Sequence, residues 1–99
     1  MNSRLYFVVR SDLSVGKQMA QALHAMDLWT AKYGYQGGTV IVYEVSSEKR
    51  LLDLMPETGK TVVFREPDLD MEATAFATDQ GPFKLPLLGR KQRKMQCAA

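Results

Sequence analysis

The chain has 99 residues, enough for one domain around a single small core. Hydrophobic residues make up 45% and charged residues 24%, as in ordinary soluble globular proteins. The sequence has no run of 18 apolar residues and no charged segment leading into an apolar one, which argues against a membrane span and a signal peptide. The single cysteine, Cys97, excludes an internal disulfide and a cysteine-based metal cage, so a cytoplasmic location is the default expectation.

The formal net charge is only +2, but the charges are segregated along the chain. Residues 66–72 carry four acidic side chains and no basic one, and residues 84–94 carry five basic side chains and no acidic one. A basic tail predicts contact with a polyanion, and a solubilising terminus is the alternative. The acidic residues are Glu66, Asp68, Asp70 and Glu72, and the basic ones are Lys84, Arg90, Lys91, Arg93 and Lys94.

The first predicted element is a strand over residues 4–10, whose continuous apolar centre is typical of a strand buried on both faces. A polar loop follows, in which Ser14 is a good helix N-cap. The helix that begins there should end at about Tyr33, before Gly34.

A helical wheel of this segment separates two sides. Lys17, Gln21, His24 and Leu28 lie within about 60° of each other, on the side opposite the predicted core face. Core packing therefore does not explain this polar row. The predicted core face consists of Met19, Ala22, Leu23, Met26, Trp29 and Tyr33.

The remaining elements complete an α/β pattern of strand, helix, strand, helix, strand, strand. We expect a mixed four-stranded sheet, because strand–helix–strand units favour parallel pairing and a short link favours an antiparallel hairpin. Residues 1–82 would form the domain and residues 83–99 a basic tail. The later strands are expected at 39–45, 60–66 and 71–78, and the second helix at 48–55.

Two segments resemble type-2 peptidyl-tRNA hydrolases. "VVRSDLSVGKQMAQALHA", residues 8–25, is similar to the strand, loop and first helix of that family. "FREPDLDMEATAFA", residues 64–77, resembles the bacterial branch, in which a Phe-Arg-Glu-Pro-Asp-Leu stretch precedes a Thr-Ala strand. The resemblance spans about residues 4–82 and implies an α/β fold that hydrolyses the ester between a peptide and tRNA.

The acidic loop departs from the archaeal and eukaryotic branch of the family. Glu66 takes the place of that branch's aspartate, with Asp68 as the competing candidate, and Thr74 matches the strand threonine. The Arg-Thr pair of that branch has no counterpart here, the loop is shorter, and no last helix is evident after Gly81-Pro82.

Ester hydrolysis needs an activated water, a stabilised oxyanion and a hold on a polyanion, and the chain offers groups for each. Glu66 or Asp68 would be the general base if its pKa is raised. Lys17 would stabilise the oxyanion or bind the terminal phosphate, and His24 would shuttle a proton or form a hydrogen bond to the ribose. Thr74 would orient the water or the substrate. The expected substrate-binding residues are Arg10, Asp12, Gln21, Arg90 and Lys91.

These groups would share one edge of the sheet if the first and third strands, ending at Arg10 and Glu66, are parallel neighbours. The predicted partner is tRNA, without a cofactor, a metal ion or a membrane. A homodimer is possible, with Trp29, Tyr33 and Tyr35 either in its contact or closing the core. The altered loop and the absent last helix motivate an alternative, a catalytically inactive domain that binds RNA or protein.

Overall fold

The computed structural model describes residues 4–35 and 37–88. The elements follow each other as strand, helix, strand, helix, strand, 3₁₀ turn and strand, which confirms the predicted α/β class. No helix in these residues is long and apolar enough to cross a membrane. The elements are β1 (Arg4–Arg10), α1 (Val15–Tyr33), β2 (Thr39–Val45), α2 (Glu48–Leu54), β3 (Thr61–Glu66), η1 (Pro67–Leu69) and β4 (Glu72–Thr78).

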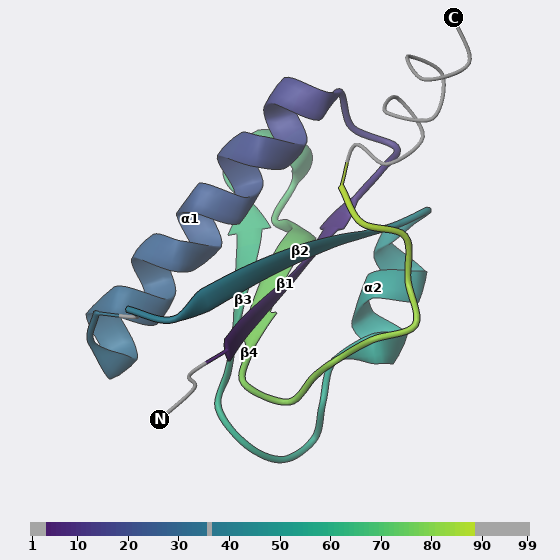
Figure 1. The fold of residues 1–99 in the computed structure, drawn as a ribbon. Coiled ribbons are helices and arrows are strands. Elements are labelled where there is room, and N and C mark those ends of the chain that lie inside the picture. The colour runs from purple at the N-terminus through teal and green to yellow at the C-terminus, as the bar shows by residue number, and fades with distance from the viewer. Residues whose placement is uncertain (1–3, 36, 89–99) are drawn as a thin grey trace, which may run out of the picture.

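The four strands form one mixed sheet in the order β2-β1-β4-β3, with a helix on each face (Figure 1). β1 and β2 are parallel, and β4 is antiparallel to both β1 and β3. The predicted hairpin of the last two strands is therefore confirmed. The first and third strands are parallel but are not the neighbours that the condition for a shared edge required, because β4 lies between them. Their carboxyl ends still reach the same edge of the sheet.

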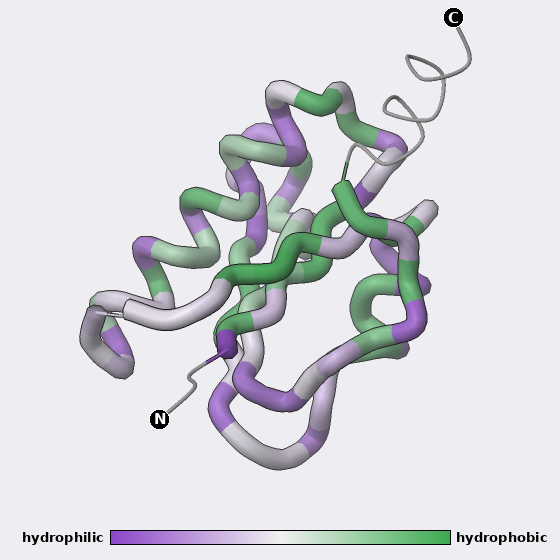
Figure 2. The backbone as a smooth tube through the Cα atoms, viewed as in Figure 1, coloured by the Kyte–Doolittle hydropathy of each residue, from purple (hydrophilic) through white to green (hydrophobic). Residues whose placement is uncertain are grey.

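The sheet separates two apolar clusters, and its strands are the most continuously hydrophobic part of the backbone, whereas hydrophobic and hydrophilic residues alternate along α1 (Figure 2). Under α1, the side chains of Leu5, Phe7 and Val9 pack with Trp29 and with small alanines of β4. Under α2, the side chains of Val8 and Phe76 pack with those of Leu51 and its neighbours. The continuous apolar centre of β1 supplies both clusters, as its sequence predicts.

The chain after β4 runs back across the α2 side and pairs with the free edge of β2. The Glu44 backbone N–H donates to the Pro86 carbonyl at 2.9 Å, and the Leu88 N–H donates to the Val42 carbonyl at 3.0 Å. We call residues 83–88 the strap. Although the sequence assigned them to a basic tail, the strap residues Phe83, Leu85 and Leu87 pack against the α2 cluster.

The buried face of α1 differs from the prediction in the first half of the helix. The buried residues are Gln18, Gln21, Ala25 and Trp29, and Ala22, Met26 and Tyr33 of the predicted face also pack against the cluster under α1. Met19 and Leu23 instead are 54% and 66% exposed. The wheel assigned the core face to the bulkiest apolar side chains. In its first half the helix instead turns Gln18 and Gln21 inward, where the Leu13 carbonyl, Glu66 and Thr74 bind their amides.

Smaller differences lie at element ends. α2 ends at Leu54 rather than Met55, β3 begins at Thr61, and β4 begins at Glu72. Of the aromatic residues considered for a dimer contact, Trp29 closes the core at 5% exposure, and Tyr35 is 89% exposed.

A matched pair of leucine substitutions tests this packing. Leu51→Ala should lower the free energy of unfolding by about 2–5 kcal/mol, because Leu51 is fully buried under the sheet. Leu23→Ala should change it by less than about 0.5 kcal/mol, because the side chain is mostly exposed. Chemical denaturation measures both. A large loss of unfolding free energy in Leu23→Ala would show that Leu23 is buried, as the helical wheel predicted.

Candidate functional site

The candidate site lies at the edge of the sheet where β1 ends, β3 ends and β4 begins. Its main distortion is a β-bulge between β3 and β4. Phe64 pairs with Ala75 and Arg65 pairs with Ala73, so Thr74 has no opposite residue. In a regular strand Thr74 would face the same side as Phe76. The bulge turns it to the α1 side instead, as bulges near sites commonly do.

Thr74 thereby enters a short chain of buried polar groups. Its hydroxyl donates to Gln21 Oε1 at 2.7 Å, and Gln21 Nε2 donates to Glu66 Oε1 at 3.1 Å. Thr74 is fully buried and Gln21 is 6% exposed. Because the threonine hydroxyl donates to the amide oxygen, the amide NH₂ group is held toward the Glu66 carboxylate. Three residues from α1, β3 and β4 thus form one connected unit.

A second cluster surrounds the Arg10 guanidinium, whose side chain is only 9% exposed. Arg10 donates to both carboxylate oxygens of Asp12, at 3.1 and 2.7 Å, and to Glu72 at 2.6 Å. It also donates to the backbone carbonyl of Ala73 at 3.3 Å. The Glu48 carboxylate accepts from the N–H of the same residue at 2.8 Å. Arg10 and Glu48 therefore hold the backbone beside the bulge.

These contacts shift two pKa values in opposite directions. The hydrogen bonds from Arg10 hold the pKa of the Asp12 carboxyl below its ordinary value, although burial acts against them. The same hydrogen bonds to Asp12, helped by those to Glu72, raise the already high pKa of Arg10. The guanidinium therefore stays charged at every pH at which the fold persists.

The loop before β4 is tightly turned. Asp70 and Met71 both have positive φ angles, of 53° and 64°, which non-glycine residues rarely adopt. The Met71 N–H donates to the Glu66 carbonyl at 2.9 Å and closes the turn. The turn leads the chain from the end of β3 directly into the bulge, so backbone strain is concentrated beside the polar groups.

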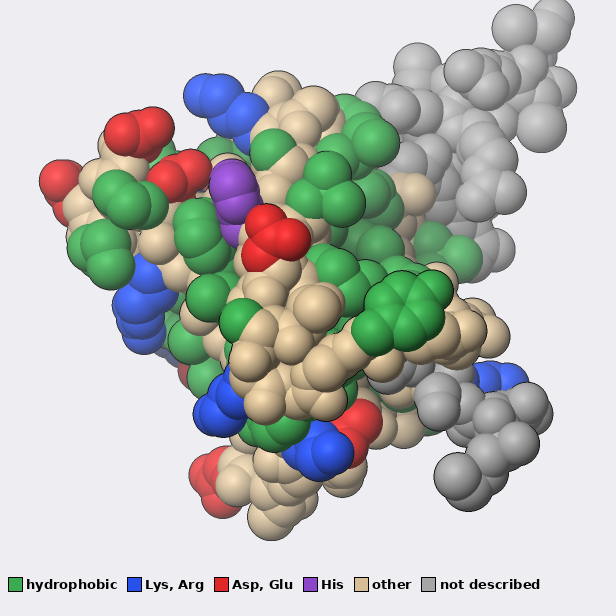
Figure 3. Space-filling model, turned by 90° about the vertical axis from the view of Figure 1, so that its left-hand side faces the viewer, with side chains coloured by type: hydrophobic (Ala, Val, Ile, Leu, Met, Phe, Trp, Pro, Cys, Tyr) green, Lys and Arg blue, Asp and Glu red, His purple; other side chains and the backbone are tan. Residues whose placement is uncertain are grey.

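The other predicted catalytic residues flank this unit. His24 is exposed and stacks on the Phe64 ring, with centroids 4.6 Å apart. Figure 3 shows the histidine, in purple, on the surface with acidic side chains on either side. Lys17 is exposed at the start of α1, where its backbone N–H donates to the Ser14 cap, and Asp68 is exposed on η1. Among the described residues, no hydrogen bond joins these three side chains to Gln21, Glu66 or Thr74.

The polar row of α1 is therefore split: Gln21 is inserted into the protein, and Lys17 and His24 remain at the surface one turn to either side. Of the predicted substrate-binding residues, Arg10 and Asp12 bind each other. Arg90 and Lys91 lie outside the described residues. In residues 4–35 and 37–88, no three His, Cys, Asp or Glu side chains gather as a metal site requires.

Two residues that contribute to the site were not predicted from the sequence. Glu48 is an acidic residue in the first turn of α2, and nothing in the neighbouring sequence indicates that it reaches the bulge. Gln18 is 3% exposed, its Nε2 donates to the Leu13 carbonyl at 2.7 Å, and its Oε1 has no partner in the described structure. Its position one turn before Gln21 is the only signal that could have paired the two amides.

The sequence matches no family model, and no curated protein matches it.

The Arg10–Asp12 pair predicts a specific pH dependence of stability. Since the pKa of Asp12 is lowered in the folded state, the pair stabilises the fold above the ordinary value of 3.8, and this stabilisation is lost as the pH falls through the lowered pKa. Asp12→Asn should therefore be less stable than wild type at neutral pH, and the difference should shrink on acidification. Chemical denaturation between about pH 6 and pH 3 measures it.

Asp53→Asn is the control, because Asp53 pairs with Lys49 on the surface of α2 and both side chains are more than half exposed. It should differ little from wild type throughout. A destabilisation by Asp12→Asn that stays constant over this pH range would contradict the assignment of the ionised pair.

Proposed function

We propose that the protein hydrolyses the ester bond between tRNA and a peptide or N-blocked amino acid, in the cytoplasm, releasing free tRNA. The observation that supports this most is the Thr74–Gln21–Glu66 chain. The sequence predicts Glu66 and Thr74 as site residues, in a segment far from α1. Gln21, predicted from the polar row of α1, forms hydrogen bonds to both of them.

In this proposal Glu66 is the general base. Its carboxylate is half-buried, is held by the Gln21 amide on one oxygen and leaves the other oxygen free to take a proton from water. Asp68, the competing candidate, is exposed on η1 and has no contact in the described residues that would orient it. Gln21 and Thr74 are positioning residues, because each acts on the reaction through Glu66.

The flanking residues supply the remaining functions. The Lys17 ammonium, near the N-terminus of α1, would stabilise the negative charge on the ester oxygen as water attacks. His24 would give a proton to the departing ribose oxygen, with its ring oriented by Phe64. Arg10, predicted to bind substrate, has its guanidinium occupied by Asp12 and Glu72. We assign it instead to holding the bulge.

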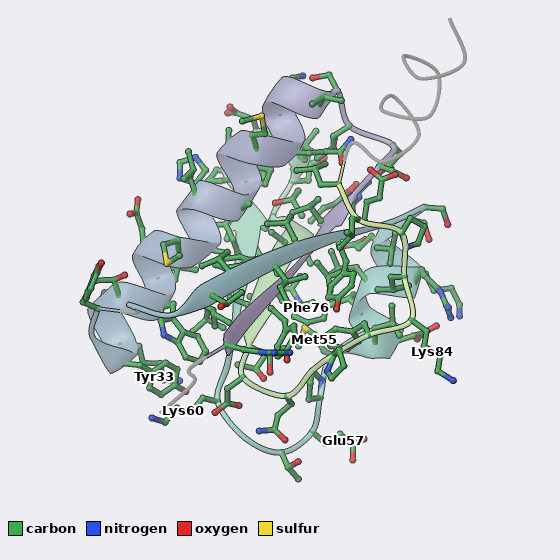
Figure 4. All side chains as sticks on the ribbon, viewed as in Figure 1. Tyr33, Met55, Glu57, Lys60, Phe76 and Lys84 are labelled. Carbon is green, nitrogen blue, oxygen red and sulfur yellow. The ribbon has the colours of Figure 1, made fainter. Side chains whose placement is uncertain are left out.

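Turnover of N-acetylaminoacyl-tRNA without added metal tests the proposal. Glu66→Gln should lower kcat by roughly a hundredfold or more, because the amide cannot accept the proton. Asp68→Asn should retain activity near that of wild type. Glu57→Gln is the matched control, since Glu57 is exposed in the loop at the far end of the sheet (Figure 4).

If Asp68→Asn instead loses roughly a hundredfold in kcat and Glu66→Gln loses none, Asp68 is the general base. If the wild-type protein binds tRNA tightly and leaves the ester intact at high protein concentration, the hydrolase proposal fails. That result would support the alternative, an inactive domain that binds RNA.

A further inference from the structure

A separate pocket of about 410 Å³ opens at the carboxyl ends of the parallel strands β1 and β2. β1 leads into α1 on one face of the sheet, and β2 leads into α2 on the other. Neighbouring parallel strands whose connections diverge in this way leave a crevice between them, where ligands of α/β proteins commonly bind. The volume is within the range of roughly 300–1,000 Å³ typical of small-molecule sites.

Main-chain contacts fix the floor and one wall of this pocket. The Ser11 N–H and hydroxyl both donate to the Val45 carbonyl, at 2.7 and 3.1 Å, and tie the two strand ends together. The strap forms the wall, held to β2 by the Glu44 N–H bond to Pro86. The pocket is therefore preformed by backbone pairing, which lowers the entropic cost of binding a ligand.

Two cations line the pocket. Arg50 comes from α2 and Lys84 from the strap. Figure 4 shows Lys84 on the α2 side of the sheet. In the described residues neither forms an ion pair, in contrast to Lys49, the neighbour of Arg50, which binds Asp53 at 3.1 Å. The Ser46 hydroxyl also lines the pocket and can donate to an anion.

The charge balance limits the kind of anion. Glu44 is the one acidic residue in the lining, so two cations against one carboxylate leave a single net positive charge. A singly charged phosphodiester matches that balance better than a doubly charged free phosphate. Leu85 and Pro86 add an apolar part to the lining, which a base can contact.

We propose that this pocket binds one phosphodiester of single-stranded RNA, with Arg50 and Lys84 on the phosphate and a flanking base against Leu85 and Pro86. The choice of RNA among phosphodiesters rests on the proposed function. Ser11 lines the pocket and directly follows Arg10, so a strand of RNA held here would begin beside the Arg10 cluster.

Titration with the dinucleotide ApA, followed by backbone amide NMR shifts, tests this without any measurement of turnover. In wild type, ApA should shift the amides of Ser46, Leu85 and their neighbours and should bind about tenfold more tightly than adenosine or inorganic phosphate. Arg50→Gln and Lys84→Gln should each weaken ApA binding severalfold or more. Lys49→Gln, the adjacent lysine that already has a partner, should leave it unchanged.

Glu44→Gln tests whether the net charge of the pocket sets its preference for ApA over inorganic phosphate. Removing this carboxylate should strengthen the binding of inorganic phosphate relative to ApA, whereas the exposed control Glu57→Gln should not. The proposal is overturned if ApA binds Arg50→Gln as tightly as wild type, or if inorganic phosphate binds wild type as tightly as ApA does. If the protein binds ApA specifically but does not hydrolyse the ester, the pocket proposal stands and the proposed function fails.

Discussion

The geometry of the sheet edge that carries the candidate site depends on the hydrogen bonds of the Arg10 guanidinium. A cation that is nine-tenths buried must have its donors satisfied, and here they reach Asp12, Glu72 and the Ala73 carbonyl. Asp12 belongs to the loop that leads into α1, and Glu72 begins β4. One side chain thus joins the end of β1 to two of the three segments that carry the polar site, α1 and β4.

The bulge follows from the same constraint. The Ala73 carbonyl is bound by Arg10 and its N–H by Glu48, so both backbone polar groups of this residue are held by side chains. The next residue, Thr74, has no partner across the ladder and turns toward α1. There its hydroxyl sets the orientation of the Gln21 amide, which in turn holds Glu66. Helices on opposite faces of the sheet therefore cooperate in placing a single carboxylate.

The elements of the fold could be predicted because their signals are local. The apolar run of β1, the Ser14 cap and the short link before β4 each act over a few residues. The orientation of α1 could not be predicted in this way. The helical wheel ranks faces by hydrophobicity, but Gln21 is buried because Glu66 and Thr74, which lie far away in the sequence, satisfy its amide. Likewise, the bulge at Thr74 depends on Arg10 and Glu48, which lie far away in the sequence.

The central claim is that Arg10 holds the bulge and thereby orients Gln21. The most direct test is the NMR spectrum of the Gln21 side-chain amide in Arg10→Lys, with Arg4→Lys at the exposed other end of β1 as the control. A lysine cannot reach all the acceptors of the guanidinium, so the Gln21 NH₂ resonances should move in Arg10→Lys as they do in Thr74→Val, and should stay in place in Arg4→Lys. Unchanged Gln21 resonances in Arg10→Lys, with a clear shift in Thr74→Val, would contradict the claim.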